Sequence, residues 1–264
     1  MPIDWGLSGQ RILVTAASRG IGFGAARALL QEGASVVINS SDPGRLEEAR
    51  RQLSSIGKVQ TVTADLSVQN DIDRLVDDSI RLLGGIDALI YVTGSPKPGT
   101  FLELNYDDWL AGAKLLVVSP AYLTKRVADH MINEKIRGRM VILSSYVIRE
   151  PSLTIALSSV CRIATASLVR LLARDLGSKG IRVNGILPGY IMTKRIEQIA
   201  NDAAKRRGVT PEKVVDDIVH DIPLGRIGST EELARVIVFL ASELSSYVSG
   251  SIIPVDGAIL RSVW

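Results

Sequence analysis

The sequence predicts an α/β protein with a doubly wound parallel sheet of about seven strands. Short apolar runs rich in β-branched residues alternate with longer helical patterns along the whole 264-residue chain. Continuous apolar strands separated by helices are typical of βαβ units, whose parallel sheet is covered on both faces. Right-handed crossovers then place a ligand site at the carboxyl ends of the strands. No linker rich in Pro, Gly or Ser divides the chain, so we expect a single domain over residues 1–264.

The seven expected strands are short and apolar, and their β-branched residues favour extended backbone. In chain order they are RILVTA (11–16), SVVIN (35–39), VQTVTA (59–64), DALIYV (87–92), MVILSS (140–145), IRVNGIL (181–187) and SIIPV (251–255). The segments between them are longer and have helical periodicity. We expect helices over residues 21–31, 44–53, 69–83 and 107–133, from near residue 155 onward, within 194–220, and over 230–242.

Composition and charge argue against several functional classes. The formal net charge is +3, from 31 basic and 28 acidic residues, and basic clusters are short, so we expect no nucleic-acid partner. No apolar run approaches the roughly 18 residues that cross a bilayer, and the N-terminus lacks a secretory signal. Cys161 is the only cysteine, which excludes an internal disulfide and favours a cytoplasmic protein. No Cys/His spacing indicates a metal site, and we expect none.

A glycine-rich turn follows the first expected strand. It reads TAASRGIGFG (15–24), with glycines at positions 20, 22 and 24. Glycine lets backbone N–H groups approach a pyrophosphate, and the positive end of the helix dipole favours that anion. Such a turn after the first strand of a doubly wound sheet is typical of dinucleotide-binding proteins, although tight helix–strand packing also selects glycine.

Four segments make the chain similar to the short-chain dehydrogenase/reductase family, whose members have a Rossmann fold. The family turn TGxxxGxG reads TAASRGIG (15–22) here, with Ala16 in place of the first glycine. Asp65-Leu66 matches the family's adenine-contacting aspartate. IRVNGILPGYIMT (181–193) matches the nicotinamide-contacting segment, and SGSIIPVDGA (249–258) matches the C-terminal strand. The resemblance covers essentially the whole chain and implies a nicotinamide dinucleotide cofactor.

The resemblance also implies which residues contact that cofactor. In relatives the residues at Pro188 and Gly189 contact the nicotinamide, and the residue at Thr193 bonds its carboxamide. The full expected set is Thr15, Ala16, Ser18, Arg19, Gly20, Ile21, Gly22, Ser40, Ser41, Asp65, Leu66, Thr93, Gly94, Arg162, Pro188, Gly189, Ile191 and Thr193.

Two residues favour NADP(H) over NAD(H). An acidic residue at the tip of the second strand would hold the ribose 2′-hydroxyl and repel a 2′-phosphate, but this tip is the neutral Ser40. Arg19 lies in the turn, where NADP-using relatives often carry a basic residue. The alternative is that Arg19 is a solvated charge and that Asp42 only caps the next helix.

The catalytic positions of the family are altered in this chain. Relatives use a serine after the fifth strand, a tyrosine with a lysine four residues later, and an asparagine in the preceding long helix. Only the serine is plainly kept, as Ser145. The tyrosine and lysine positions hold Ser158 and Arg162, and the asparagine position holds Leu116. Residues 147–178 contain no tyrosine or lysine, so a shifted register does not restore the motif.

These substitutions leave the proton donor open. Arg162 keeps a positive charge that can stabilise an oxyanion, but an arginine does not give up its proton. Serine is a far weaker acid than tyrosine, whose ordinary pKa is about 10. The donor is either Ser158 or Tyr146, which follows Ser145 directly. Alternatively, the Tyr146 ring only caps the substrate pocket.

Two functional hypotheses follow. The first is an NADP(H)-preferring oxidoreductase that transfers hydride between the cofactor and a small carbonyl or alcohol, in a divergent branch similar to 3-oxoacyl-[acyl-carrier-protein] reductases. The second is a non-catalytic dinucleotide-binding protein, a sensor or scaffold. The polar segment 194–220 lies where relatives have a substrate lid. The resemblance also implies a homotetramer or a homodimer, paired through the long helix and the helix that begins near residue 155.

Overall fold

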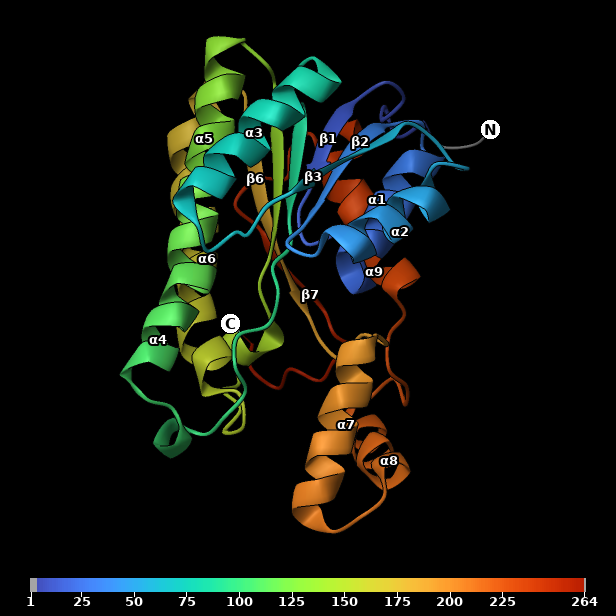
Figure 1. The fold of residues 1–264 in the computed structure, drawn as a ribbon, viewed down its shortest axis with the longest axis vertical. Coiled ribbons are helices and arrows are strands. Elements are labelled where there is room, and N and C mark those ends of the chain that lie inside the picture. Colours follow the sequence, from blue (N-terminus) through green and yellow to red (C-terminus); the bar gives the residue numbers. More distant parts are fainter. Residues whose placement is uncertain (1–3, 264) are drawn as a thin grey trace.

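The computed structural model describes residues 4–263, which form one parallel sheet of seven strands and confirm the predicted fold class (Figure 1). The strands are β1 (Arg11–Val14), β2 (Ser35–Ser40), β3 (Val59–Thr63), β4 (Ala88–Tyr91), β5 (Arg139–Leu143), β6 (Arg182–Pro188) and β7 (Ile252–Val255). They lie in the order β3-β2-β1-β4-β5-β6-β7. Because β1 pairs with both β2 and β4, the winding direction reverses at β1 and the strand ends open a crevice there.

The helices that connect the strands cover both faces of the sheet. They are α1 (Gly20–Gln31), α2 (Pro43–Leu53), α3 (Gln69–Leu83), α4 (Tyr106–Ala113), α5 (Ser119–Asn133), α6 (Ala156–Leu176), α7 (Lys194–Arg207), α8 (Pro211–Asp221) and α9 (Thr230–Ala241). α1, α2 and α9 pack on one face, and α3, α5 and α6 pack on the other (Figure 1).

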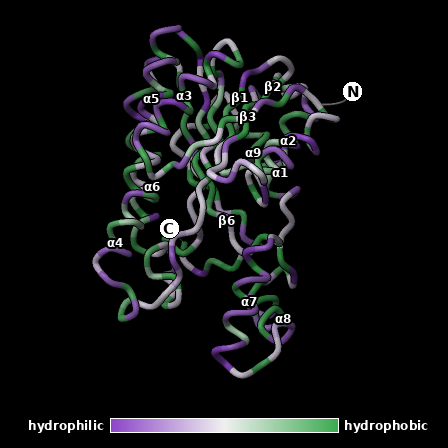
Figure 2. Tube along the Cα trace, in the orientation of Figure 1, coloured by the Kyte–Doolittle hydropathy of each residue, from purple (hydrophilic) through white to green (hydrophobic). Residues whose placement is uncertain are grey.

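Alternation of side chains along the strands divides the core between the two faces. In β1, Ile12 and Val14 pack against the layer of α1 and α9, whereas Leu13 packs against the layer of α3 and α5. All three side chains are fully buried, which explains why the strand is a continuous apolar run. Figure 2 shows apolar residues along the strands and hydrophilic residues on the outer sides of the helices.

Two strands end two residues earlier than predicted at the edge that faces the crevice. β1 ends at Val14 instead of residue 16, and β5 ends at Leu143 instead of residue 145. Beyond β1, the Thr15 hydroxyl accepts a hydrogen bond from Val92 N at 2.9 Å and donates one to Val92 O. These side-chain bonds take the place of further strand pairing, and the residues that follow form loops at the crevice.

The long helix predicted over residues 107–133 is interrupted. A π-helical turn, Lys114–Val118, separates α4 from α5. Pro120, in the first turn of α5, has no N–H group to donate to the carbonyl of Leu116 four residues earlier. Thr165 of α6 donates to that carbonyl instead, at 3.3 Å. Helical periodicity does not reveal this interruption, because the interruption depends on one proline and on Thr165, which is distant in the chain.

Within residues 4–263, α6 is the one helix long and apolar enough to cross a membrane by length and composition alone. Core helices of globular proteins meet the same criterion. α6 packs along β6, and its Val169 and Leu176 are buried in the core on that face of the sheet. We therefore interpret α6 as a core helix.

α7 and α8 stand apart from the sheet, beside the carboxyl ends of the strands (Figure 1). They pack on each other through a small apolar cluster that includes Ala204, Val214 and Ile218. Gly208 ends α7 in the left-handed conformation, with φ 66°, and Thr210 caps α8. The two helices fill the polar segment expected at 194–220.

Asn39 provides a test of how the crevice loops are held. Its buried side-chain amide donates to Val62 O at 3.1 Å and to Ala64 O at 3.0 Å. Asn39→Ala removes both hydrogen bonds from a buried site and should lower the free energy of unfolding by about 2–3 kcal/mol in a denaturant titration. Gln60→Ala, at an exposed position of β3, is the matched control and should change it by less than about 0.5 kcal/mol. Equal effects of the two substitutions would contradict this role of Asn39.

Candidate active site

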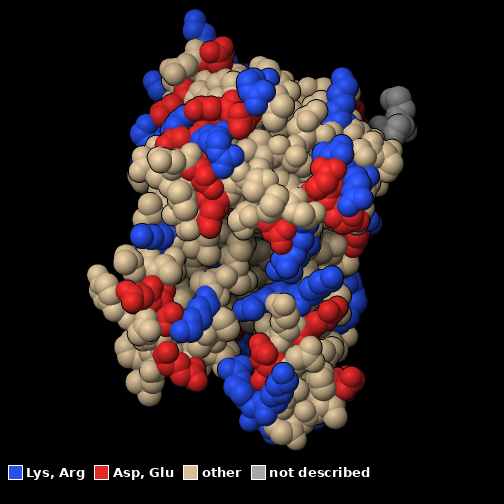
Figure 3. All heavy atoms as spheres, in the orientation of Figure 1, with Lys and Arg blue, Asp and Glu red and all other residues tan. Residues whose placement is uncertain are grey.

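A large cleft opens at the carboxyl ends of the strands, between the sheet and α7. Its volume is about 1680 Å³. Small-molecule pockets usually measure about 300–1,000 Å³, so this cleft has room for a dinucleotide together with a small substrate. The turn after β1, the ends of several strands, the first turns of α6 and the inner side of α7 line it. Figure 3 shows a hollow in this region, with Lys and Arg side chains near its opening.

The turn between β1 and α1 presents backbone N–H groups to the cleft, because no side chain caps α1. Gly20 has φ 59°, in the left-handed region that favours glycine, and Ala16 has φ 46°, at the position where relatives carry glycine. A Cβ atom on Gly22 would lie 2.5 Å from Ala16 O, so the close approach of helix and strand requires glycine. This turn fits the pyrophosphate of a dinucleotide.

The end of β2 is polar and carries no carboxylate at its tip. Ser40 Oγ lies 3.0 Å from the Ser18 hydroxyl, which donates to it, and accepts another hydrogen bond from Asp42 N. Asp42 caps α2 by accepting from Arg45 N at 3.0 Å, as one of the two interpretations of this residue expects. Arg19 is exposed and lines the cleft, and it forms no ion pair with any residue of 4–263.

The strand ends opposite the turn complete the cofactor side of the cleft. A Cβ atom on Gly189 would lie 2.7 Å from Asp256 Cα, so glycine is required where β6 passes β7. The Thr193 methyl group lies 3.5 Å from the place of a Cβ on Gly20, which brings the start of α7 against the turn. Asp65, after β3, accepts a hydrogen bond from Ser67 N at 2.8 Å at the far end of the cleft.

The expected cofactor residues line this cleft, with one exception. The lining includes Ala16, Ser18, Arg19, Gly20, Ile21, Gly22, Ser40, Ser41, Asp65, Leu66, Thr93, Gly94, Arg162, Pro188, Gly189, Ile191 and Thr193. Thr15 is the exception, because its side chain is fully buried and both hydrogen bonds of its hydroxyl group go to Val92. Thr15 positions the cofactor turn and does not line it.

Arg162 places a buried positive charge in the cleft. Arg162 is 9% exposed and has no carboxylate partner among residues 4–263. The guanidinium donates only weakly, to Ser144 O at 3.5 Å and to Gly94 O at 3.4 Å. Burial lowers the pKa of Arg162, but an arginine stays protonated in proteins. The cleft thus contains a fixed cation that can stabilise an oxyanion.

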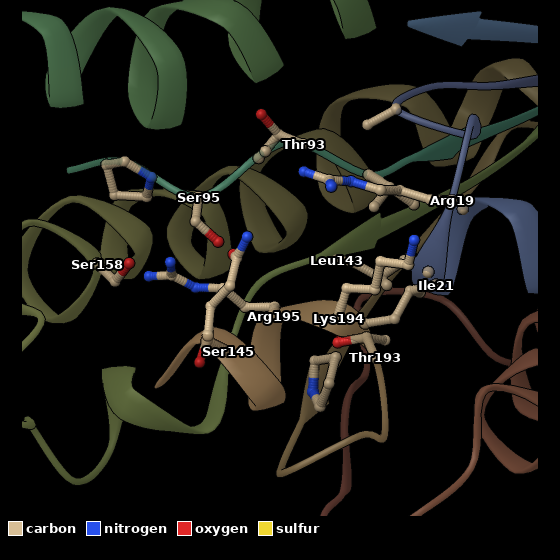
Figure 4. Close-up of a pocket in the computed structure, with 18 of the residues that line it drawn as sticks. Arg19, Ile21, Thr93, Ser95, Leu143, Ser145, Ser158, Thr193, Lys194 and Arg195 are labelled. Atoms are coloured by element: carbon tan, nitrogen blue, oxygen red, sulfur yellow. The ribbon is translucent and has the colours of Figure 1, made fainter. Parts of the chain in front are cut away.

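Two serine hydroxyls line the same cleft (Figure 4). Ser145 caps the short 3₁₀ helix Tyr146–Ile148, and its Oγ accepts from Val147 N at 3.4 Å. Ser158 lies in the first turn of α6, one turn before Arg162 and on the same helical face. Its hydroxyl makes no hydrogen bond within the described part of the chain, so it is free to bind a substrate oxygen.

The tyrosines of this region differ from the catalytic tyrosine of relatives. Tyr146 lines the cleft and packs against Tyr190, with ring centroids 5.6 Å apart. Burial, and to a smaller extent Tyr190, raise the pKa of Tyr146 above its ordinary value. Tyr91 lies outside the cleft lining, where its hydroxyl is 3.0 Å from Ser119 Oγ and burial raises its pKa to about 12.

Other reactive side chains lie outside the cleft. Cys161 is buried, and burial raises the pKa of its thiol. His130 Nε2 accepts a hydrogen bond from Ile86 N at 3.2 Å, at the amino end of β4. Residues 4–263 contain no group of three or more His, Cys, Asp or Glu arranged to hold a metal ion.

The cleft lining also includes residues that are absent from the sequence-based set, among them Ser95, Lys194 and Arg195 (Figure 4). Ser95 follows the expected Thr93-Gly94, and the two cations follow Thr193 at the start of α7. Their proximity in sequence to expected residues was the available signal. The directions of the Lys194 and Arg195 side chains could not be derived from the sequence, because they depend on how α7 is placed over the strand ends.

Comparisons with known proteins agree with this geometry. Residues 15–258 match a family model described as enoyl-(acyl carrier protein) reductase. Dehydrogenase/reductase SDR family member 4 of Caenorhabditis elegans is 35% identical over 95% of this chain and 95% of its own length. Gluconate 5-dehydrogenase of Gluconobacter oxydans is 33% identical over 99% of both chains. The L-sorbose reductase of Gluconobacter frateurii, solved with NADPH and L-sorbose, is 28% identical, with a TM-score of 0.93 over 99% of this chain and 100% of that chain.

The matched region includes the glycine-rich turn, the strand ends and the start of α7, which together form the cleft. The relatives and neighbours named above are dehydrogenases and reductases, and the shared cleft has the backbone features that a nicotinamide dinucleotide requires. The chain therefore belongs to the short-chain dehydrogenase/reductase family of NAD(P)-dependent oxidoreductases.

Proposed function

We propose that the protein is an oxidoreductase that transfers hydride between NADP(H) and a carbonyl or alcohol substrate. The observation that carries the proposal is the buried, ion-pair-free Arg162 beside the cofactor positions of the cleft. A bound nicotinamide would supply or accept the hydride. The side chains of this protein would hold the reacting oxygen: Ser145 donates a hydrogen bond to it, and Arg162 stabilises the negative charge that develops there.

We assign proton delivery to Ser158. Its hydroxyl is free, lines the cleft and lies one turn from Arg162. In the reductive direction the hydroxyl gives its proton to the alkoxide and takes one back from water in the open cleft, which balances the step. Tyr146 is the second candidate, but its raised pKa and its contact with Tyr190 favour a role as a wall of the substrate pocket. In this proposal Ser158-x-x-x-Arg162 replaces the Tyr-x-x-x-Lys motif, in a branch similar to 3-oxoacyl-[acyl-carrier-protein] reductases.

Preference for NADP(H) is supported by charge at the adenosine end of the cleft. Arg19 is an exposed cation in the turn, and the tip of β2 is Ser40 instead of a carboxylate. A 2′-phosphate would pair with the Arg19 guanidinium and meet no repelling charge at Ser40. The neighbour from Gluconobacter frateurii was solved with NADPH.

We further propose that residues 1–264 act as one domain in which α7 and α8 form a substrate lid. We also propose a cytoplasmic location and a homodimer or homotetramer paired through α4–α6, and apolar side chains that are 43% to 63% exposed on these helices support the pairing. They are Leu110, Val118, Val160, Ile163 and Leu171.

The activity itself can be tested by substitution of the buried cation. The purified protein should oxidise NADPH with members of a panel of ketones and aldehydes, followed by NADPH absorbance. Arg162→Gln should lower kcat at least about 100-fold, because it removes the charge that stabilises the oxyanion. Arg170→Gln, at an exposed position of the same helix, is the matched control and should retain kcat within about twofold. NADPH binding without turnover of any panel member would instead support the non-catalytic sensor or scaffold.

Cofactor preference should depend on Arg19. Arg19→Gln is expected to weaken NADPH binding about 10- to 100-fold while NADH binding changes by less than about threefold, because only NADPH has the 2′-phosphate. Fluorescence titration of both cofactors measures the two constants. Arg45→Gln, which removes a nearby cation that already pairs with Asp42, serves as the control. A parallel loss for both cofactors would contradict the assignment of Arg19 to the 2′-phosphate.

The proton donor can be identified from paired variants and a pH profile. Ser158→Ala should lower kcat about 100-fold, whereas Tyr146→Phe should change it less than about threefold. Arg162 and Ser158 do not titrate near neutrality, and the pKa of Tyr146 is raised, so it stays protonated there. The kcat of reduction should therefore be flat between about pH 6 and pH 9. A large loss in Tyr146→Phe would transfer the donor role to Tyr146.

A further inference from the structure

The side of α7 that faces the cleft carries charge where a lid over an apolar substrate would carry apolar residues. Beyond its first residue, α7 lines the cleft with the polar residues Arg195, Gln198, Asp202, Lys205 and Arg206, and with the apolar Ile196 and Ile199. Their spacing of three, four and seven places them along one face of the helix. The other face packs on α8 through Ala200 and Ala204. We call the cleft-facing residues of this set the lid stripe.

The cations of the lid stripe have no carboxylate within ion-pair distance in the described part of the chain, although Glu103 of the cleft lining lies within electrostatic range of Arg206. Within residues 4–263, neither Arg195, Lys205 nor Arg206 forms an ion pair. The next residue, Arg207, pairs with Asp217 of α8 at 2.6 Å. Three cations against the one carboxylate of Asp202 leave the lid stripe with a formal charge of +2.

Within the lid stripe, Arg195 is the residue nearest in sequence to the expected cofactor-binding residues. It lies two residues after Thr193, and Figure 4 shows its side chain extending into the cleft toward the side that carries Ser158. Arg195 is half-buried, and its guanidinium presents a planar fork of donors, which suits a carboxylate.

The wall opposite α7 is rich in hydroxyl groups. It includes Ser95, Ser145, Ser152, Thr154 and Ser158. Ser152 and Thr154 lie within 3.3 Å of each other, oxygen to oxygen, at the start of α6. Hydroxyl side chains both donate and accept hydrogen bonds, so this wall can bind a ligand with several hydroxyl groups of its own.

We propose that the substrate is a short polyhydroxylated carboxylate, such as a sugar acid or its keto form. Arg195 binds the carboxylate, the hydroxyl wall binds the carbon chain, and the reacting carbon lies at Ser145 and Ser158. Lys205 and Arg206 attract the anion to the cleft mouth. This inference rests on the proposed function for the identity of the reacting end, but the binding preference it requires does not depend on turnover.

The test uses two ligands that differ in one group. D-Gluconate and D-sorbitol share a six-carbon polyol chain, and one terminal hydroxymethyl group of sorbitol is a carboxylate in gluconate. Neither can be reduced by NADPH, so their binding to the NADPH-saturated protein is measured by calorimetry without a reaction. Gluconate should bind at least about tenfold more tightly than sorbitol, and added salt should weaken only gluconate binding.

Variants assign the preference to Arg195. Arg195→Gln should bring gluconate binding to the level of sorbitol, and Arg195→Lys should retain part of the preference because it keeps the charge without the planar fork. Arg207→Gln removes the same charge from the outer side of α7 and is the matched control, with the preference retained. NADPH affinity should be unchanged in Arg195→Gln.

Each contrary result overturns the inference. Equal binding of gluconate and sorbitol to the unmodified protein, or no binding of either, excludes the substrate class. A loss of NADPH affinity in Arg195→Gln would make Arg195 a cofactor residue. The proposed function is tested separately, by measuring NADPH-dependent reduction of 5-keto-D-gluconate and of L-sorbose. These two ketones also differ only in a terminal carboxylate against a hydroxymethyl group, and no reduction of either would contradict the proposed function. Gluconate preference without turnover would leave a selective binding protein.

Discussion

The whole cleft depends on how the loops after β1 and β4 are fixed to each other. The Thr15 hydroxyl bonds both the N–H and the carbonyl of Val92, across the point where the winding of the sheet reverses. One strand away, Asn39 binds two carbonyls at the end of β3. A buried polar group that loses its hydrogen-bond partner destabilises the folded state strongly. These loops therefore have one favoured arrangement. The cofactor turn and the loop that carries Thr93 start from these fixed points.

Within that frame, Arg162 changes the kind of chemistry that the site can perform. A catalytic tyrosine with a neighbouring lysine combines proton transfer with a positive charge. Arg162 supplies the charge permanently, and two distant backbone carbonyls do little to neutralise it. Burial of an unpaired cation is costly unless a ligand compensates for it. In the proposed mechanism, the site therefore stabilises negative charge first, and proton transfer falls to weak acids such as Ser158.

The fold could be predicted almost entirely from sequence, because buried parallel strands and covering helices have distinct patterns. Most residues that line the cleft at the expected cofactor positions followed from motif positions at strand ends. Thr15 did not, because motif matching does not separate a residue that lines a turn from one that holds it. The π turn before Pro120 also escaped prediction, since Thr165, which satisfies the free carbonyl, lies on another helix. The direction of Arg195 depends on the placement of α7 and has no local signal.

The charge on α7 bears on how a lid could close over this cleft. A lid with an apolar inner face closes by hydrophobic burial even before substrate binds. The inner face of α7 instead carries Arg195, Lys205 and Arg206, and it approaches a cleft that already contains Arg162 and Arg19. Like charges oppose that approach until anions lie between them. In the proposed complex, a phosphate-bearing cofactor would supply part of the compensation and an anionic substrate would supply the rest, so we expect closure to be favoured only when both are bound.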